Sequence, residues 1–221
     1  MKNIILQHYS GKIQDVQKLS IQNIEKYAES QGAEYRFLEG SVFDSSLSPP
    51  MQKLVMLDSQ FDSYDTVVMV DTDMFTRAGM EDSIFDQVGI GVSADFQRRL
   101  KWSLIRKRKG LVHWKYPYWG GSVWKLSLFE RQMFRSNLHK VNLRKFSEGL
   151  LEDEGVMHWL AYHSKFKGGI LPDNNRWSWP SYLPGIERAS LIHVRTKVRP
   201  KGPERDKIEN LIALKDHGLI N

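Results

Sequence analysis

Residues 66 to 73 read Thr66-Val67-Val68-Met69-Val70-Asp71-Thr72-Asp73, and this stretch decides the fold class. The run that ends at Val70 is apolar on both alternating faces, which is typical of a strand covered by helices on both sides. Two carboxylates follow at the carboxyl end of that strand, where α/β sheets bind their ligands. The stretch therefore predicts a central strand of an α/β fold that leads into an acidic binding site.

The sequence around this strand alternates strand and helix patterns, which favours parallel βαβ units in one sheet. Ser48 is the expected N-cap of the helix before the central strand, with Pro49 at its first position. The elements predicted over the first ninety residues are a strand at Ile4–Leu6, a helix from about Val16 to Gly32, a strand at Glu34–Leu38, a helix at Ser48–Leu57, a helical segment at Asp82–Phe85 and a strand at Val88–Val92.

The second half of the chain has a more mixed pattern. Ser127-Leu128-Phe129-Glu130 is a capping box, which predicts the start of a helix. Further predicted elements are a helix at Glu148–Ser164, a strand at Ala189–Val194 and a helix at Pro203–Lys215 that ends before Gly218. We find no internal repeat or low-complexity segment, so one domain is the simplest account.

Composition narrows the function classes. The absence of cysteine excludes disulfides, cysteine zinc sites and thiol catalysis. The net charge of +6 favours anionic partners such as nucleotide phosphates, nucleic acid or acidic glycans. No apolar run approaches the roughly 20 residues that span a bilayer, and the N-terminus has no signal-peptide pattern. We therefore expect a cytoplasmic protein without a transmembrane segment.

Asp71 and Asp73 are the first candidate site residues. Two carboxylates at a strand end can direct oxygens at one hard divalent cation, directly or through water. The alternative is a turn cap with two solvated carboxylates. An Asp-x-Asp pair is weak evidence alone, and its position after the central strand is what favours a metal site.

The segment Val67–Met74 resembles the Asp-x-Asp strand of GT-A glycosyltransferases, which bind nucleotide-sugar diphosphates through Mn²⁺ or Mg²⁺. The resemblance implies a central, mainly parallel mixed sheet flanked by helices. It also implies a single domain over residues 1–221, with a nucleotide-binding βαβ half at 1–95 and a half at 96–221 that completes the donor site and holds the acceptor.

The end of the chain adds to this resemblance. Ile192–Pro200 is similar to the His-x-x-x-Lys-Pro-type ending of glycogenin-like and galactosyltransferase-like members, although the Gly usual between His and Lys is absent. In those members the His completes the metal shell and the Lys holds the diphosphate. The resemblance thus implies that His193 joins Asp71 and Asp73 on the metal, and that the His193 ring lies within about 6 Å of the Asp73 carboxylate.

The same resemblance assigns the remaining site residues. It implies that Asp153 and Glu154, in an acidic cluster, meet the sugar hydroxyls and the reacting centre. It implies that the donor is bound by Gln7, His8, Tyr9, Lys53, Asp71, Asp95, Trp119, Gly120, Gly121 and Lys197.

Each assignment has a purely structural alternative. His193 can be a hydrogen-bonded, half-buried imidazole, and Lys197 a solvated lysine. Asp153 and Glu154 can form a solvated helix face. The Gly120-Gly121 pair can be a bulge, and Trp119 and Trp177 can be core residues and not sugar platforms.

The implied activity is metal-dependent transfer of a sugar from a nucleotide-diphosphate sugar, UDP favoured, to a glycan or other hydroxyl, with retention of configuration. Small viral and phage enzymes that decorate capsid glycans are similar in length. One alternative is a haloacid-dehalogenase-type phosphatase or phosphotransferase, but Phe75 and Thr76 do not match its motif. A second is a nucleic-acid-binding module built on the basic run Arg98–Lys109, which no known motif supports.

Overall fold

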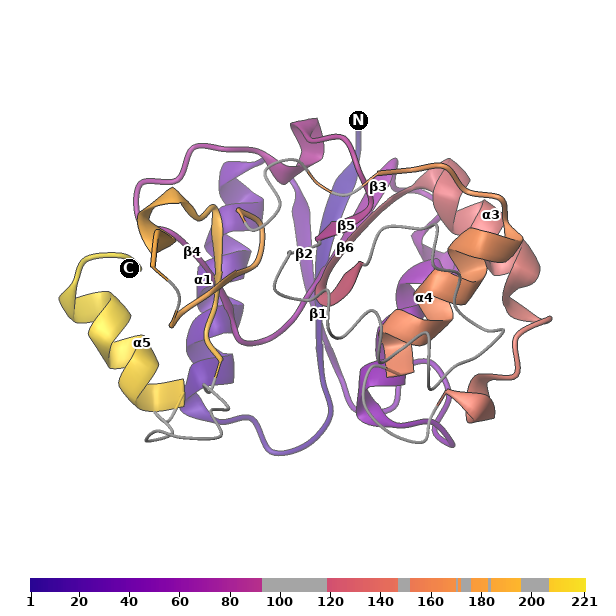
Figure 1. Ribbon diagram of the computed structural model, residues 1–221, viewed down its shortest axis with the longest axis horizontal. Helices are drawn as coiled ribbons and strands as arrows, with labels where there is room; N and C mark the ends of the chain where they lie inside the picture. The colour runs from indigo at the N-terminus through magenta and orange to yellow at the C-terminus, as the bar shows by residue number, and fades with distance from the viewer. Residues whose placement is uncertain (93–118, 147–151, 170, 172–175, 183, 196–206) are drawn as a thin grey trace.

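The computed structural model describes residues 1–92, 119–146, 152–169, 171, 176–182, 184–195 and 207–221. Within these residues a central sheet stands between two layers of helices (Figure 1). Helix α1 (Asp15–Ser30) covers one face, and helices α3 (Leu128–Leu138) and α4 (Glu152–His163) cover the other. The sequence prediction of an α/β fold with a mixed sheet flanked by helices is confirmed.

The central sheet has the strand order β2-β1-β3-β6-β5. Strand β1 pairs in parallel with β2 and β3, while β6 pairs antiparallel with β3 and β5. The strands are β1 (Asn3–Tyr9), β2 (Glu34–Glu39), β3 (Thr66–Val70), β5 (Gly91–Val92) and β6 (Gly120–Ser127). Because β6 lies between β3 and β5, this one sheet combines strands from both halves of the chain.

A second, smaller sheet attaches beside the carboxyl end of β3. It has the order β4-β8-β7 and consists of β4 (Met74–Thr76), β7 (Trp179–Pro180) and β8 (Leu191–His193). Helix α5 (Lys207–Asp216) packs beside it, on the same side of the central sheet as α1 (Figure 1). This sheet brings the last third of the chain next to the Asp-x-Asp turn.

Three apolar clusters hold these layers together. The first fills the space between the central sheet and α3 and α4, and the second lies between the sheet and α1. The third joins α1, β4, β8 and α5 through residues such as Val16, Phe75 and Leu211. Alternate residues of β3 point into opposite clusters, with Val67 in the first and Val68 in the second, as the sequence of a doubly covered strand predicts.

Several predicted boundaries and element types differ in the structure. The segment after Ser48 is a 3₁₀-helix, η1 (Pro49–Leu57). Ser48 is its N-cap residue and Pro49 its first residue, as predicted, but the Ser48 hydroxyl donates to Glu152 and makes no capping hydrogen bond. The predicted strand at 88–92 is reduced to β5, which pairs antiparallel and not in a βαβ unit. The other short helices among the described residues are η2 (Ser59–Phe61), η3 (Ile84–Asp86), η5 (Leu143–Lys145) and η6 (Ile186–Arg188).

The predicted capping box and two predicted helix ends are confirmed. The capping box at Ser127 forms as predicted: its hydroxyl accepts from the Glu130 amide, and the Glu130 carboxylate accepts from the Ser127 amide. Gly32 and Gly218 follow α1 and α5 with positive φ angles, which is the conformation that ends a helix. No helix within the described ranges is long and apolar enough to cross a membrane.

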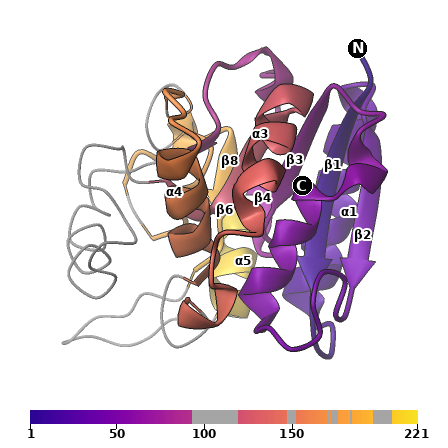
Figure 2. The same ribbon diagram turned by 90° about the vertical axis from the view of Figure 1, so that its right-hand side faces the viewer.

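Helix α3, labelled in Figure 2, is fixed to the rest of the fold by a fully buried arginine, Arg131. The Arg131 guanidinium donates to the backbone carbonyls of Leu126, Phe61 and Tyr64 at 2.9, 3.0 and 2.6 Å. These contacts tie the start of α3 to the loop that precedes β3. Since burial penalises the charge, the pKa of Arg131 is lowered, and the carbonyl oxygens compensate for the lost water.

We predict that Arg131→Met destabilises the protein by about 2–4 kcal/mol, because three backbone carbonyls lose their hydrogen bonds to the buried guanidinium. The measurement is the midpoint of urea unfolding followed by circular dichroism. The neighbouring Gln132→Met, at an exposed position of the same helix, serves as control and should change stability by less than about 0.5 kcal/mol. Equal effects of the two substitutions would show that Arg131 does not anchor α3.

Candidate metal centre

A tight turn after β3 carries both aspartates of the Asp-x-Asp motif. The Asp71 amide still donates to the Ser122 carbonyl of β6, at 2.9 Å, so Asp71 is the last sheet-bonded residue of this strand. The Met74 amide donates back to the Asp71 carbonyl at 3.2 Å and closes the turn, after which β4 begins. The two carboxylates therefore flank one turn at the carboxyl end of the central strand.

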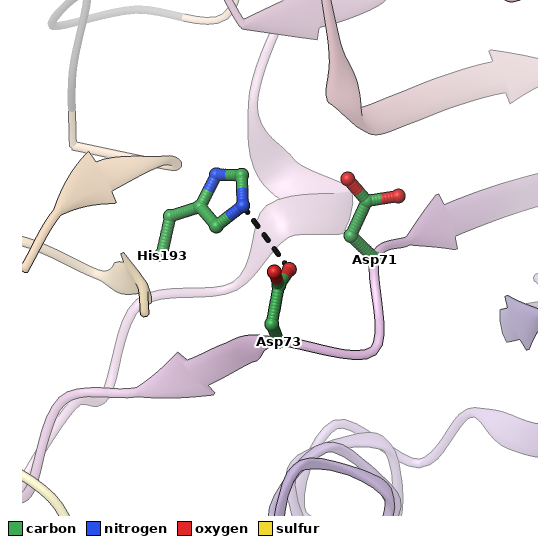
Figure 3. Close-up of side chains that lie close together, drawn as sticks. All are labelled: Asp71, Asp73 and His193. Atoms are coloured by element: carbon green, nitrogen blue, oxygen red, sulfur yellow. Dashed lines mark ion pairs between the residues drawn. The ribbon is translucent and has the colours of Figure 1, made fainter. Parts of the chain in front are cut away.

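Strand β8 brings His193 to this turn. In the antiparallel β4–β8 pair His193 is directly opposite Met74, and the Val194 amide donates to the Asp73 carbonyl at 2.8 Å. As a result His193 Nε2 lies 3.1 Å from Asp73 Oδ1. Figure 3 shows the imidazole directed at the Asp73 carboxylate, with the Asp71 side chain on the same side of the turn. The predicted proximity of His193 and Asp73 is thus present.

These three side chains suit a divalent cation. One potential ligand atom from each of Asp71, Asp73 and His193 lies within 4.8 Å of the other two. Neighbouring ligands of an octahedral ion with bonds of about 2.1 Å are separated by about 3 Å, which agrees with the 3.1 Å between Asp73 and His193. Two carboxylates with one imidazole form a donor set that accepts Mn²⁺ or Mg²⁺, the imidazole favouring the transition metal.

The Asp73 carboxylate is held in its ionised form. Burial alone raises its pKa, but the nearby His193 and Lys207 outweigh burial and hold the pKa well below its usual range. Lys207, on α5, forms an ion pair with the second carboxylate oxygen, Oδ2. Asp73 is therefore negatively charged at neutral pH, as a metal ligand must be.

Lys53 on η1 is the buried cation of the site. Its Nζ lies 2.8 Å from Asp71 Oδ1 and 2.7 Å from Asp153 Oδ2, and it donates to the Gly121 carbonyl at 2.8 Å. Burial lowers the pKa of this lysine, but the carboxylates of Asp153 and Asp71 outweigh that effect and raise it overall. The ammonium group is thus permanently charged and links η1, β3, β6 and α4.

The acidic cluster of α4 is directed at this lysine and at the start of β6. Asp153 is buried, which raises its pKa, and the adjacent Lys53 opposes that rise. Glu154 Oε1 accepts from the Gly121 amide at 2.6 Å. A Cβ on Gly121 would lie 2.7 Å from Asp153 Oδ2, so only glycine lets α4 approach β6 this closely. Asp153 and Glu154 are therefore committed to contacts within the protein, and a catalytic role for them stays a prediction.

A cleft of about 310 Å³ opens over the Asp-x-Asp turn. Its walls come from the end of β1, the start of η1, the turn itself and the start of α5. The lining residues are His8, Tyr9, Ser10, Gln17, Pro49, Pro50, Lys53, Asp71, Thr72, Asp73 and Lys207. Two lysines and two aspartates thus face the same space, which suits a ligand that carries both a metal ion and phosphate groups.

The three predicted donor residues of β1 separate into two groups. His8 and Tyr9 line the cleft. Burial lowers the His8 pKa, and Nε2 lies 2.7 Å from the Gly40 carbonyl, so the neutral ring donates through Nε2 and keeps Nδ1 as an acceptor. Gln7 is fully buried: its amide donates to the Asp71 carbonyl at 2.9 Å and to Ser20 Oγ at 3.1 Å. Gln7 therefore supports the turn from below and does not face the cleft.

The predicted aromatic platform is part of the core. The Trp119 side chain is fully buried, with its ring centroid 5.1 Å from that of His158. Trp177 is also buried, in the cluster beneath α1. Neither ring presents a face on which a sugar can stack, because packing takes both faces. Gly120 is a buried residue of β6 beside Val92, so the Gly-Gly pair belongs to a strand, at a place where the pairing of β5 and β6 has an irregular register.

Two assigned donor residues, Asp95 and Lys197, lie outside the described residues, as does the basic run Arg98–Lys109. Sequence reasoning did not identify Lys207, Ser178 or Ser122 as residues of the site. Ser178 Oγ lies 3.4 Å from His193 Nδ1 and 2.7 Å from Ser122 Oγ. No local signal marks these residues, since a serine near a strand or a lysine in a charged helix is common.

Comparisons with known proteins agree with this topology. No protein family and no curated protein matches the sequence. Among solved structures, the chain is similar to a glycosyltransferase involved in the glycosylation of the major capsid of PBCV-1, with a TM-score of 0.59, 11% identity, and coverage of 97% of this chain and 100% of that one. It is also similar to the galactosyltransferase LgtC in complex with donor and acceptor sugar analogues, with a TM-score of 0.54, 13% identity and 86% of each chain covered. The chain therefore has the GT-A glycosyltransferase fold that its sequence predicted.

The serine pair generates a prediction for the metal centre. If His193 binds metal through Nε2, its Nδ1–H must donate to Ser178 Oγ, a contact that fixes the ring and its tautomer. We predict that Ser178→Ala lowers Mn²⁺ affinity by about tenfold, measured from the free Mn²⁺ signal in electron paramagnetic resonance. Ser178→Thr retains the hydroxyl and should stay close to wild type. Unchanged affinity in Ser178→Ala, with an unchanged circular dichroism spectrum, would exclude this positioning role.

Proposed function

We propose that this protein is a glycosyltransferase that transfers a sugar from a nucleotide-diphosphate sugar to a hydroxyl acceptor, and that the donor diphosphate is bound at the metal centre of Asp71, Asp73 and His193. The observation that carries the proposal is the convergence of these three side chains. They come from the end of β3, the turn before β4 and the end of β8, yet their ligand atoms lie within 4.8 Å of one another. The GT-A fold supports the same function.

The chemistry of sugar transfer explains the charges in the cleft. The bond between the anomeric carbon and the diphosphate oxygen breaks, with its electron pair passing to the diphosphate, and the acceptor oxygen bonds to that carbon as its proton passes to the departing diphosphate. Negative charge grows on the departing diphosphate, while the anomeric centre becomes cation-like. A divalent ion, when bound, supplies Lewis-acid stabilisation of the diphosphate. Asp71, Asp73 and His193 would hold that ion in position.

Lys53 has a positioning role in this proposal. Its ammonium group is fixed by two carboxylates and one carbonyl, so it cannot leave to follow a ligand. It orients the Asp71 carboxylate at the edge of the cleft through their 2.8 Å contact. His8 and Tyr9 border the same space and are the described residues of β1 best placed to contact the nucleoside.

The proposal extends to finer points that rest on the sequence resemblance. These are Mn²⁺ or Mg²⁺ as the cofactor, a UDP-sugar as the donor, a glycan as the acceptor and retention of configuration. The proposal also includes Lys197 and Asp95 as donor-binding residues.

The phosphatase alternative accounts for less of the geometry. It requires an Asp nucleophile in the Asp-x-Asp motif but gives no reason for an imidazole 3.1 Å from the second aspartate. The nucleic-acid alternative rests on Arg98–Lys109 and makes no use of the cleft. Sugar transfer is the function that uses the metal ligands, the buried lysine and the cleft together.

The direct test is a panel of nucleotide sugars incubated with the protein and Mn²⁺, with the release of free nucleoside diphosphate as the readout. We expect slow hydrolysis of one donor, because water can replace the acceptor hydroxyl. Release of inorganic phosphate from phosphate esters, without turnover of any nucleotide sugar, would support the phosphatase instead.

We predict that Asp73→Asn lowers donor hydrolysis at least about a hundredfold, because the metal loses a charged ligand at the diphosphate. His193→Ala should lower Mn²⁺ affinity as well as turnover. The matched control is Asp216→Asn, which removes a carboxylate at an exposed position of α5 and should retain wild-type turnover. Full activity in the folded Asp73→Asn protein would refute the metal centre.

A further inference from the structure

Asp73 already has a cationic partner in this structure. Lys207 on α5 forms an ion pair with Oδ2 of Asp73, while His193 contacts Oδ1. Lys207 is separated from Asp73 by 134 positions in the sequence, so only the packing of α5 against β4, β8 and α1 brings the two together. Neither the sequence motifs nor the roles given above to the other residues account for this contact.

Lys207 differs from the other lysine of the cleft in how firmly it is held. The Lys53 side chain is 13% exposed and contacts two carboxylates and a carbonyl. The Lys207 side chain is 36% exposed, and its ion pair is with a single oxygen of Asp73. Its four-carbon stem is flexible and can turn the ammonium toward other partners that enter the cleft. Lys53 is therefore a fixed charge, whereas Lys207 can exchange one anion for another.

A divalent ion and the Lys207 ammonium compete for the same carboxylate. An ion bound to Asp73 and His193 would lie about 2.1 Å from a carboxylate oxygen, and an ammonium on the other oxygen would be only a few ångströms from that ion. Like charges at this distance in a partly buried site repel strongly. Binding of the ion therefore favours release of Lys207 from Asp73.

The cleft gives the released ammonium a new partner. Lys207 lines the same space as Lys53, Asp71 and Asp73. A nucleoside diphosphate bound on the metal would place phosphate oxygens in that space, and an ammonium group binds phosphate as a point charge. The lysine would then exchange a carboxylate for a diphosphate, without leaving the cleft.

We propose that Lys207 is an exchangeable cation of the donor site, which neutralises Asp73 in the metal-free protein and binds the donor diphosphate once the metal occupies Asp73 and His193. This inference rests on the proposed function. It assigns Lys207 two opposite effects, because the same ammonium group opposes metal binding and favours nucleotide binding.

The experiment measures both effects on the full chain. Mn²⁺ is titrated alone and followed by the free Mn²⁺ signal in electron paramagnetic resonance, and uridine diphosphate is then titrated at saturating Mn²⁺ by calorimetry. We expect Lys207→Met to bind Mn²⁺ about tenfold more tightly, and uridine diphosphate about tenfold more weakly, than wild type. Lys207→Arg keeps the charge and should remain close to wild type in the Mn²⁺ titration.

Lys215→Met is the matched control, because Lys215 is an exposed lysine of the same helix, and it should leave both affinities unchanged. Wild-type or weaker Mn²⁺ binding by folded Lys207→Met would overturn the inference. Tighter Mn²⁺ binding with unchanged nucleotide affinity would overturn its second half. Asp73→Asn separates this outcome from failure of the proposed function: if that variant binds Mn²⁺ as wild type does, or if no variant binds it, the metal centre itself is refuted and the inference with it.

Discussion

The buried ammonium group of Lys53 is the contact on which the rest of the site depends. It lies between Asp71 at the end of β3 and Asp153 on α4, and it donates to Gly121 on β6. Removing one partner of such a buried pair leaves an uncompensated charge and typically costs about 3–5 kcal/mol. The lysine therefore holds the central strand, the antiparallel strand beside it and the covering helix in one arrangement.

This arrangement requires a close approach of helix and strand. Gly121 allows it, because any Cβ there would meet the Asp153 carboxylate at 2.7 Å. With α4 seated on β6, Asp71 is oriented at the cleft edge and Asp73 continues the turn into β4. The small β4-β8-β7 sheet then adds His193 from one side, and α5 adds Lys207. Three elements thus each bring one side chain to the Asp-x-Asp turn: Lys53 from η1, His193 from β8 and Lys207 from α5.

The distribution of charge explains why the site is suited to a metal and a diphosphate together. Asp71 and Asp153 share one permanently charged lysine. Asp73 is held ionised by a histidine and a second, more exposed lysine. The two lysines of the site therefore differ in how firmly they are held, because Lys53 contacts two carboxylates and a carbonyl, whereas Lys207 contacts one carboxylate oxygen.

The sequence by itself determined the central strand, its acidic end, the capping box at Ser127 and the α/β class, because these depend on local periodicity and on hydrogen bonds between near neighbours. It also indicated His193 as a partner of Asp73, through a resemblance in motif and not through any local physical signal. Only the tertiary structure decided that Trp119 is a core residue, that Gln7 supports the turn from below, and that Ser178 and Lys207 contact His193 and Asp73. Those outcomes depend on the antiparallel pairing of β6 with β3, on that of β8 with β4, and on the packing of α5. These contacts join residues far apart in the chain, and therefore no local sequence pattern predicts them.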